Sequence, residues 1–316
     1  MLENIGLLLA GLVILIVGGE LLVRGASSIA LRLHLSPLVV GLTIVAFGTS
    51  APEMLISIKS ALAGSPDLAM GNVVGSNICN LALVLGITTI INPVKVQGTS
   101  LKIDWPMTFG ASVLLYLTAQ NGLITIWEGI CFILILIAYN WYIIRRSRRE
   151  TKAMKLLEEE LDIPAAPSKH LWKDLMFILI GCIGLYYGAE WFVGGAQSLA
   201  VYLGVTERII GLTVLALGTS LPELVTACIA SFKKETDIAL GNLLGSNIFN
   251  ILSILGVTSV IQSVSVSDAI LEIDMLWMLG ITFLVFLMML HRRQIFRYEG
   301  IILLGIYFFY TYLIMF

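Results

Sequence analysis

Long apolar segments separated by short polar ones run through the whole chain. At roughly 20 residues each, these segments are long enough to cross a bilayer as helices. They predict ten transmembrane helices, at about residues 4–23, 37–62, 68–91, 103–119, 124–144, 171–193, 207–231, 238–261, 273–290 and 299–316. The longest polar interruption, residues 145–170, divides them into two sets of five. We therefore expect an all-α integral membrane protein with halves at residues 1–144 and 171–316.

Two motifs occur twice, each time 170 residues apart. GLTIVAFGTSAPEM at residues 41–54 returns as GLTVLALGTSLPEL at 211–224, and GNVVGSNICN at 71–80 returns as GNLLGSNIFN at 241–250. The copies lie within about residues 37–91 and 207–261. Because each half has an odd number of spans, the second copy must enter the membrane from the opposite face. The pattern therefore predicts two inverted-topology repeats, an arrangement typical of secondary transporters.

Composition and charge support a membrane protein and predict its orientation. Only 13% of residues are charged, against about 25% in soluble domains. Basic residues favour the cytoplasm, so the Arg-rich loop 145–170 is expected inside and both termini outside. Seventeen of the nineteen Lys and Arg residues then lie inside, the exceptions being Lys59 and Arg208. The first apolar segment follows Glu3 rather than a basic region, which indicates a retained span and not a signal peptide.

Both copies of the first motif place an ionisable residue inside an apolar span. Glu53 and Glu223 each follow a proline, Pro52 or Pro222. A charge inside a membrane is costly, so two of them at repeated positions point to one central cation site. Because proline cannot donate a backbone hydrogen bond, we expect helices 2 and 7 to be broken here. The breaks are expected to free backbone carbonyls as cation ligands, those of Gly48, Gly218, Ala46 and Ala216.

Neutral oxygen donors accompany the glutamates at helical spacing. Hydroxyls precede each glutamate by three and four residues, and the second motif forms a polar stripe with one member every four residues: Asn72, Ser76 and Asn80, repeated as Asn242, Ser246 and Asn250. Oxygen-only ligation with two negative charges suits Ca²⁺, which takes six to eight oxygens. For Asn72, Asn77, Asn242 and Asn247, helix packing is as good an explanation as ligation. Glu20, Glu190, Asp104 and Asp274 lie near span ends, where an interfacial or ion-pairing role is expected.

With these residues in view, the chain resembles the cation/calcium antiporter superfamily, specifically the prokaryotic sodium/calcium exchangers. The resemblance rests on the paired GTSxPE and GNxxGSNxxN motifs and covers essentially the whole length. It implies that spans 2, 3, 7 and 8 form the ion-binding core and that spans 1 and 6 slide against it. It implies Ca²⁺ ligation by Glu53 and Glu223 with the carbonyls of Thr49 and Thr219. Sodium sites are implied at Ala46, Ser50, Ser76, Ala216, Ser220 and Ser246, with Asn80 and Asn250 lining the cavity.

One departure from the family pattern bears on the coupling ion. Potassium-dependent and some archaeal members have aspartate where this chain has Asn250. The proton-coupled branch has a further acidic residue in the second motif, where this chain has the neutral pairs Val74-Gly75 and Leu244-Gly245. Both differences favour sodium as the counter-ion.

The sequence thus predicts an antiporter that exchanges Na⁺ for Ca²⁺ by alternating access. An exchanger of the same fold driven by H⁺, or dependent on K⁺, is the alternative, and a cation channel is a more distant one. No metalloprotease motif or Ser–His arrangement supports an enzyme, and His34, His170 and His291 lie at span ends. We expect no cofactor and no nucleic-acid partner. The expected protein is a monomer in the inner (plasma) membrane, with Ca²⁺, Na⁺ and the lipid bilayer as its partners.

Overall fold

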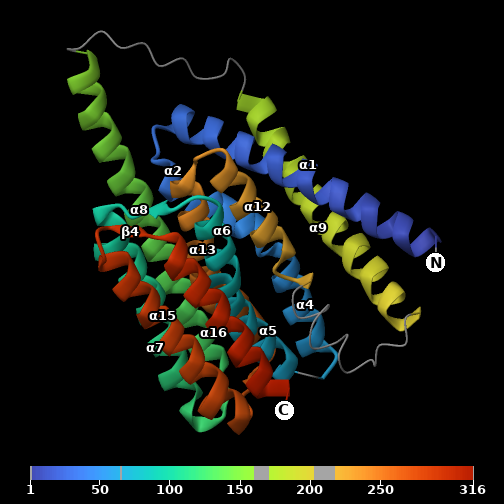
Figure 1. The fold of residues 1–316 in the computed structure, drawn as a ribbon. Helices are drawn as coiled ribbons and strands as arrows, with labels where there is room; N and C mark the ends of the chain where they lie inside the picture. Colours follow the sequence, from blue (N-terminus) through green and yellow to red (C-terminus); the bar gives the residue numbers. More distant parts are fainter. Residues whose placement is uncertain (1, 65, 160–170, 203–217, 316) are drawn as a thin grey trace.

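Long helices, roughly aligned, dominate the computed structural model, which describes residues 2–64, 66–159, 171–202 and 218–315 (Figure 1). The N-terminal half contains α1 (Leu2–Leu33), α2 (Pro37–Val40), η1 (Gly41–Val45), α3 (Ala46–Thr49), α4 (Ala51–Leu62), α5 (Pro66–Ile78), η2 (Cys79–Val84), α6 (Leu85–Ile91), η3 (Ser100–Asp104), α7 (Trp105–Thr118), η4 (Ala119–Asn121) and α8 (Ile126–Glu159). The C-terminal half contains α9 (Leu171–Tyr202), α12 (Leu221–Phe232), α13 (Thr236–Phe249), η6 (Asn250–Leu255), α14 (Gly256–Ile261), η7 (Ile270–Asp274), α15 (Met275–Leu290) and α16 (Arg297–Met315). Apart from the short 3-10 turn η4, each η element is a π-helical turn.

Most of the predicted spans coincide with helices of the structure. Among the described residues, six helices are long and apolar enough to cross a membrane, or seven if the bent pair Pro37–Thr49 and Ala51–Leu62 is one span. The helices α7 and α16 coincide with two of the other predicted spans, and α12 coincides with the second half of the span predicted at 207–231, whose residues 207–217 lie outside the described part of the chain. The chain is therefore an integral membrane protein of several spans, as its composition indicates.

Three helices, α1, α8 and α9, are longer than the apolar pattern predicts. The helix α1 ends at Leu33 rather than near residue 23. It ends there because the next residue, His34, takes a left-handed conformation, and Pro37 then starts the next helix. The helix α8 continues to Glu159, well beyond the predicted span that ends near residue 144. No proline interrupts residues 126–159, and the helix therefore runs on beyond its apolar part.

The helices α1 and α9 form an antiparallel pair along one side of the molecule (Figure 1). Glycines at seven-residue intervals line their contact: Gly11, Gly18 and Gly25 on α1, and Gly181, Gly188 and Gly195 on α9. A Cβ atom at Gly181 would lie 2.7 Å from the Leu22 backbone nitrogen, so the two backbones touch. Small residues allow such close approach in membranes. Since backbone contacts leave little freedom, the pair is expected to behave as one rigid unit.

The most buried helices carry the second motif. In the span Leu68–Ile91, 78% of the most apolar window is buried, and in Thr236–Ile261 the share is 83%. The corresponding values for α1 and α9 are 28% and 22%. The spans with the two polar stripes therefore form the centre of the bundle, and the α1–α9 pair lies at its periphery.

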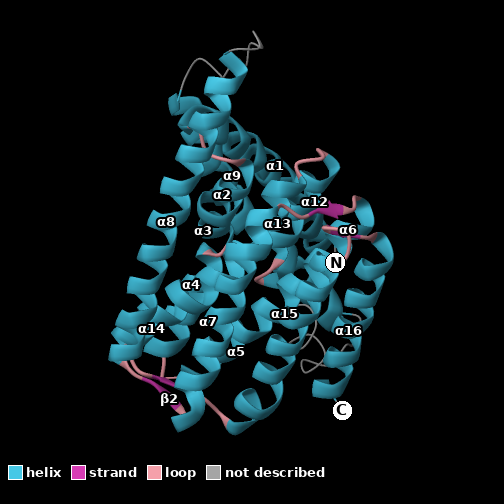
Figure 2. Cartoon of the chain, turned by 90° about the vertical axis from the view of Figure 1, so that its left-hand side faces the viewer, coloured by secondary structure: helices cyan, strands magenta, loops and turns pink. Residues whose placement is uncertain are grey.

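In the described part of the chain, two short strand pairs are the exception to an all-α fold. The strand β1 (Val94–Lys95) pairs antiparallel with β4 (Gln294–Ile295), and β2 (Leu123–Ile124) pairs with β3 (Val264–Ser265). Each pair joins a loop of one half to a loop of the other half. The strand β4 lies at the upper end of the bundle in Figure 1, and β2 lies at the lower end in Figure 2, which is turned about the vertical axis.

Candidate functional site

The second span bends at the position that the prolines predict. The segments Pro37–Thr49 and Ala51–Leu62 meet at 45°. Ser50 lies at the bend with φ −84° and ψ 2°, and Pro52 follows in the first turn of α4. Glu53 is therefore in the first turn of a new helix, where free backbone N–H groups and the helix dipole stabilise a negative charge.

The seventh span repeats this arrangement as far as the structure describes it. Ser220 precedes α12, Pro222 lies in its first turn, and Glu223 follows. The preceding residues 203–217 lie outside the described part of the chain, so the predicted break in helix 7 and the predicted ligand Ala216 lie outside it too. Glu53 and Glu223 are both fully buried, and their carboxylates are close enough to repel each other. Two acidic side chains, one from each half of the chain, thus meet in the interior of the bundle.

Glu223 is hydrogen-bonded from both halves of the chain. Ser50 Oγ donates to Glu223 Oε1 at 3.1 Å, and Ser246 Oγ donates to the same oxygen at 3.5 Å. Thr49 joins the network, since its hydroxyl lies 3.1 Å from Asn242 Oδ1 and 3.5 Å from Ser246 Oγ. The structure therefore brings the predicted hydroxyls of one repeat to the glutamate and polar stripe of the other.

Glu53 has no hydroxyl or amide donor among the described residues, and its carboxyl group faces that of Glu223. Both of its carboxylate oxygens are buried without a hydrogen-bond donor. The same holds for four further oxygens of predicted site residues, namely Glu223 Oε2, Asn80 Oδ1, Asn250 Oδ1 and Ser220 Oγ. Buried polar atoms are normally paired, because an unpaired one loses its hydration without compensation. Six unpaired buried oxygens, three of them on carboxylates, are the expected lining of a cation site.

The amides of the polar stripes divide between packing and the site. Asn72 donates to Ser57 Oγ at 3.1 Å, and Asn247 donates to the Leu243 carbonyl of its own helix at 2.7 Å. Asn250 donates to Asn77 Oδ1 at 3.1 Å, which links the eighth span to the third. The side chains of Asn72, Asn77 and Asn247 therefore have structural partners, whereas both polar atoms of Asn80 remain unpaired among the described residues.

One predicted ligand has a different environment from the one expected. The carbonyl of Ala46 is not freed by Pro52, because it accepts the Ser50 backbone N–H at 3.0 Å. A proline removes only the bond to the carbonyl four residues earlier, which is that of Gly48. Ser76 is buried on α5, and Thr219 is half-buried beside Ser220.

A crevice of ≈410 Å³ between α4 and α9 ends beside the site. Its lining residues include Pro52, directly before Glu53, and Gly218 and Thr219, which lie five and four residues before Glu223. Lys59 and Glu190 are exposed and line it as well. Because the distribution of basic residues predicts that Lys59 lies outside the cell, the crevice is expected to open to the outside.

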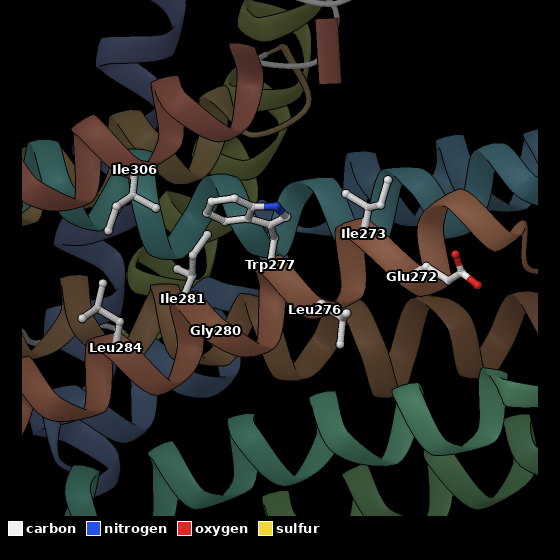
Figure 3. Close-up of a pocket in the computed structure, with 8 residues that line it drawn as sticks. All are labelled: Glu272, Ile273, Leu276, Trp277, Gly280, Ile281, Leu284 and Ile306. Carbon is white, nitrogen blue, oxygen red and sulfur yellow. The ribbon is translucent and has the colours of Figure 1, made fainter. Parts of the chain in front are cut away.

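A second hollow has no connection with these residues. Figure 3 shows a groove of ≈530 Å³ along α15 and α16, lined mainly by apolar side chains such as Trp277, Ile281 and Ile306. No predicted ion ligand lines it, and two of its lining residues, Ile273 and Leu276, are exposed large hydrophobics. The groove therefore belongs to the lipid-facing surface rather than to the ion site.

The acidic residues near span ends have three different environments. Glu20 forms an ion pair with Lys233 (Nζ to Oε1, 2.5 Å), as the pairing prediction has it. Asp104 and Asp274 instead each accept a hydrogen bond from a tyrosine hydroxyl, Tyr139 at 3.1 Å and Tyr310 at 2.8 Å. Glu190 lines the crevice.

The π-helical turns beside the motifs were not predicted from the sequence. The turns η1, η2 and η6 begin at Gly41, Cys79 and Asn250, within or at the end of the repeated motifs. Such turns are rare and frequently lie at functional sites, because each leaves backbone groups out of register. The turns η2 and η6 lie at corresponding positions of the two halves, and so do η3 and η7. The sequence repeat is therefore the one signal from which a turn in one half could have been predicted in the other.

Comparison with known proteins assigns the chain with these two buried glutamates to one family of membrane transporters. A model of the sodium/calcium exchanger protein family matches residues 3–145 and 173–316. CaxA of Alkalimonas amylolytica is 38% identical over 310 residues, covering 97% of each chain, and the inner membrane protein YrbG of Escherichia coli (strain K12) is 32% identical, covering 96% of this chain and 94% of that protein. The solved structure of the sodium-calcium exchanger NCX_Mj superposes with a TM-score of 0.83 at 29% identity and covers 97% of both chains. No group of three or more His, Cys, Asp or Glu side chains that could bind a metal occurs among the described residues.

Proposed function

The chain belongs to the sodium/calcium exchanger protein family, and on that premise we propose that it is an antiporter exchanging Na⁺ for Ca²⁺. The observation that carries the proposal is the pair of buried glutamates, Glu53 and Glu223, with unpaired oxygens around them. The family is one of transporters, and we propose no catalytic activity for the chain. The transported ions are its substrates.

Calcium would be held mainly by the two glutamates. Glu53 contributes two free oxygens and Glu223 one, and the carbonyls of Thr49 and Thr219 are further ligands by resemblance. Two carboxylates balance the charge of one Ca²⁺, whose preferred ligands are oxygens. An uncompensated pair of carboxylates in this dry interior is costly, so the site is expected to cross the membrane only when it is occupied.

Sodium would compete for the same oxygens. The hydroxyls of Ser50 and Ser246 already contact Glu223, and that of Ser220 is buried and unpaired among the described residues. With Ser76, Ala46 and Ala216, these residues form the sodium ligands that we propose. Several Na⁺ and one Ca²⁺ then exclude each other, which makes exchange obligatory, and a sodium gradient drives calcium uphill.

The neutral amides at Asn80 and Asn250 favour sodium over potassium or protons. Both are fully buried, and neither adds a carboxylate. A third acid would raise the negative charge of the site and call for a further cation. Sodium coupling without potassium is the proposal that fits two carboxylates.

For the architecture we propose ten spans in two inverted five-helix repeats. The strand pairs support it, because a shift of 170 residues takes β1 (Val94–Lys95) to β3 (Val264–Ser265), and a shift of 171 takes β2 (Leu123–Ile124) to β4 (Gln294–Ile295), so the repeat exchanges one pair for the other. A two-fold axis in the membrane plane would place the two pairs at opposite ends of the bundle. That is how Figures 1 and 2 have them.

Alternating access would be a movement of α1 and α9 against the other helices. Backbone contacts join these two helices to each other, whereas a Cβ atom at Gly19 or Gly48 would meet side-chain atoms of Ile229 or Cys182. Side-chain contacts rearrange more easily than backbone contacts. The crevice beside α9 is the proposed outer access route.

The proposed location is the inner membrane, with the loop 145–170 in the cytoplasm and both termini outside. The relative YrbG is named an inner membrane protein, and the distribution of Lys and Arg supports the orientation. We propose that a monomer suffices, because both glutamates belong to one chain.

The test is ⁴⁵Ca²⁺ uptake into proteoliposomes loaded with Na⁺, with K⁺ or at acidic pH. The proposal predicts uptake with internal Na⁺ and none with K⁺ or a proton gradient alone. Uptake driven by protons without Na⁺ would overturn the sodium assignment, and flux without any counter-ion would indicate a channel. Full uptake by both Glu53→Ala and Glu223→Ala variants would show that the site is elsewhere.

A further inference from the structure

An ion pair ties the peripheral helices to a site-bearing helix at the expected cytoplasmic end. Glu20 on α1 contacts Lys233, the residue that follows α12, with 2.5 Å between Oε1 and Nζ. Glu223 lies at the other end of α12. The pair therefore connects the α1–α9 unit to the helix that carries one of the two glutamates.

At the expected outer end of these helices, an acidic and a basic residue correspond to Glu20 and Lys233 but do not form an ion pair. Glu190 on α9 is the repeat counterpart of Glu20, 170 residues later. Lys59 lies on α4, the helix of Glu53, four residues or about one helical turn before the counterpart of Lys233 at position 63. Both side chains line the crevice, and neither forms an ion pair with a described residue.

We propose that Glu20–Lys233 and Glu190–Lys59 are alternative ion pairs that position α1 and α9 during transport. The first forms while the outer crevice is open, as in this structure. The second forms when the crevice closes and Glu190 reaches Lys59. The inference rests on the proposed alternating access and adds to it the residues that determine the balance between its two states.

The rigidity of the α1–α9 unit makes the two pairs exclusive. A Cβ atom at Gly18 would lie 2.8 Å from the Leu185 backbone nitrogen, so neither helix moves far without the other. A displacement that brings Glu190 to Lys59 moves Glu20 by a similar distance. A contact of 2.5 Å does not survive a shift of several ångströms.

These ion pairs are proposed to change the ratio of the open and closed states rather than the free energy of unfolding. The side chains of Lys233 and Glu20 are 30% and 46% exposed, and exposed ion pairs contribute little to folding. A change of about two- to fivefold in the ratio of two states is the scale expected from such a pair. If both pairs were only incidental surface contacts, removing one or the other would not shift the states in opposite directions.

The test uses a cysteine in the crevice as a reporter of the open state. Ile56 lines the crevice and carries no proposed ion ligand. An Ile56→Cys variant is made in a background with Cys79, Cys131, Cys182 and Cys228 replaced by alanine, and its labelling by a hydrophilic maleimide is timed in nanodiscs. We expect Glu20→Gln and Lys233→Gln each to slow labelling about two- to fivefold. The matched control, Lys234→Gln, should leave the rate unchanged, because Lys234 forms no ion pair among the described residues.

The outer pair is tested in the Glu20→Gln background. Adding either Glu190→Gln or Lys59→Gln should restore fast labelling, because each removes the pair that stabilises the closed crevice. Glu190→Gln removes a negative charge beside the crevice and Lys59→Gln removes a positive one. If local charge alone determined the labelling rate, the two substitutions would change that rate in opposite directions. That result, or unchanged labelling in Glu20→Gln and Lys233→Gln, would overturn the proposal. Restoration by the exchanged pair Glu20→Lys with Lys233→Glu would support it.

This readout does not depend on the transported ion. A protein that failed to take up calcium against sodium but gave the expected labelling pattern would contradict the proposed exchange and leave the two ion pairs supported.

Discussion

Ser50, at the bend between α3 and α4, donates a hydrogen bond of 3.1 Å to Glu223, 173 residues later in the chain. The counterpart of this bond in the other repeat is missing among the described residues. Ser220 Oγ is buried without a partner there, and so are both oxygens of Glu53. The two halves of the site are thus unequal in this structure. Glu223 is held by protein groups, whereas Glu53 is available to an ion.

This inequality predicts different effects for two equivalent substitutions. Ser50→Ala removes a donor from a buried carboxylate, which costs about 1–3 kcal/mol of unfolding free energy. Ser220→Ala removes a hydroxyl that has no described partner, so its cost should be clearly smaller. Thermal unfolding of the ion-free protein in detergent measures both. Equal losses would contradict the asymmetry of the site.

The features that repeat in the sequence were predictable, and those that depend on contacts between the halves were not. Pro52 gives the bend of the second span, because a missing N–H acts locally. The polar stripe predicts that Asn80 and Asn250 line the cavity, and both are buried in the structure. By contrast, the bond from Ser50 to Glu223 needs the packing of one repeat against the other, which spacing along one helix does not contain.

The expectation that Pro52 frees the Ala46 carbonyl failed for a similar reason. This carbonyl lies six residues before Pro52, outside the reach of the proline, and it accepts a normal helical bond from Ser50. Its proposed role as a sodium ligand does not depend on the proline. Likewise, apolar length predicted a span of about twenty residues for α1, but nothing stops a helix at the membrane boundary. It ends only where His34 leaves the helical conformation.

The glycine contact between α1 and α9 gives a second prediction. At Gly181, a Cβ atom would meet the Leu22 nitrogen at 2.7 Å and the Gly18 carbonyl oxygen at 2.8 Å. Gly181→Ala should therefore push the helices apart and cost about 1–3 kcal/mol. Gly194→Ala on the same helix is the control, since no described atom lies within 4 Å of the position that its added methyl group would take. Similar melting temperatures for the two variants would mean that the close contact does not stabilise the pair.

The two tyrosine–aspartate bonds give a third prediction. Asp104 is 3% exposed and its second oxygen has no described partner, whereas Asp274 is only half-buried. Tyr139→Phe leaves the Asp104 carboxylate without its donor and should cost about 1–3 kcal/mol. Tyr310→Phe should cost less, because water can replace the lost hydroxyl at Asp274. A larger loss for Tyr310→Phe in thermal unfolding would refute this account.

A third carboxylate in the site should change its ion requirement. In the proposed site, Asn250→Asp adds a negative charge near the bound ion, and at about 5 Å with an effective dielectric constant near 20 one unit charge contributes roughly 3 kcal/mol. We expect Ca²⁺ to bind at least about tenfold more tightly and more Na⁺ to be needed for its release. Asn250→Ala is the control, as it removes the same bond to Asn77 without adding charge. If both variants weakened calcium binding alike in equilibrium dialysis, Asn250 would be a packing residue and not part of the cavity.

The central claim is that Na⁺ and Ca²⁺ share the oxygens of Glu53 and Glu223. Equilibrium binding of ⁴⁵Ca²⁺ to the purified protein, titrated with NaCl at constant ionic strength with choline chloride, tests it most directly. Sodium should displace calcium completely and with a slope greater than one, and Glu53→Gln should abolish calcium binding while the variant still folds. Calcium binding that stays unchanged as sodium replaces choline would contradict the shared site.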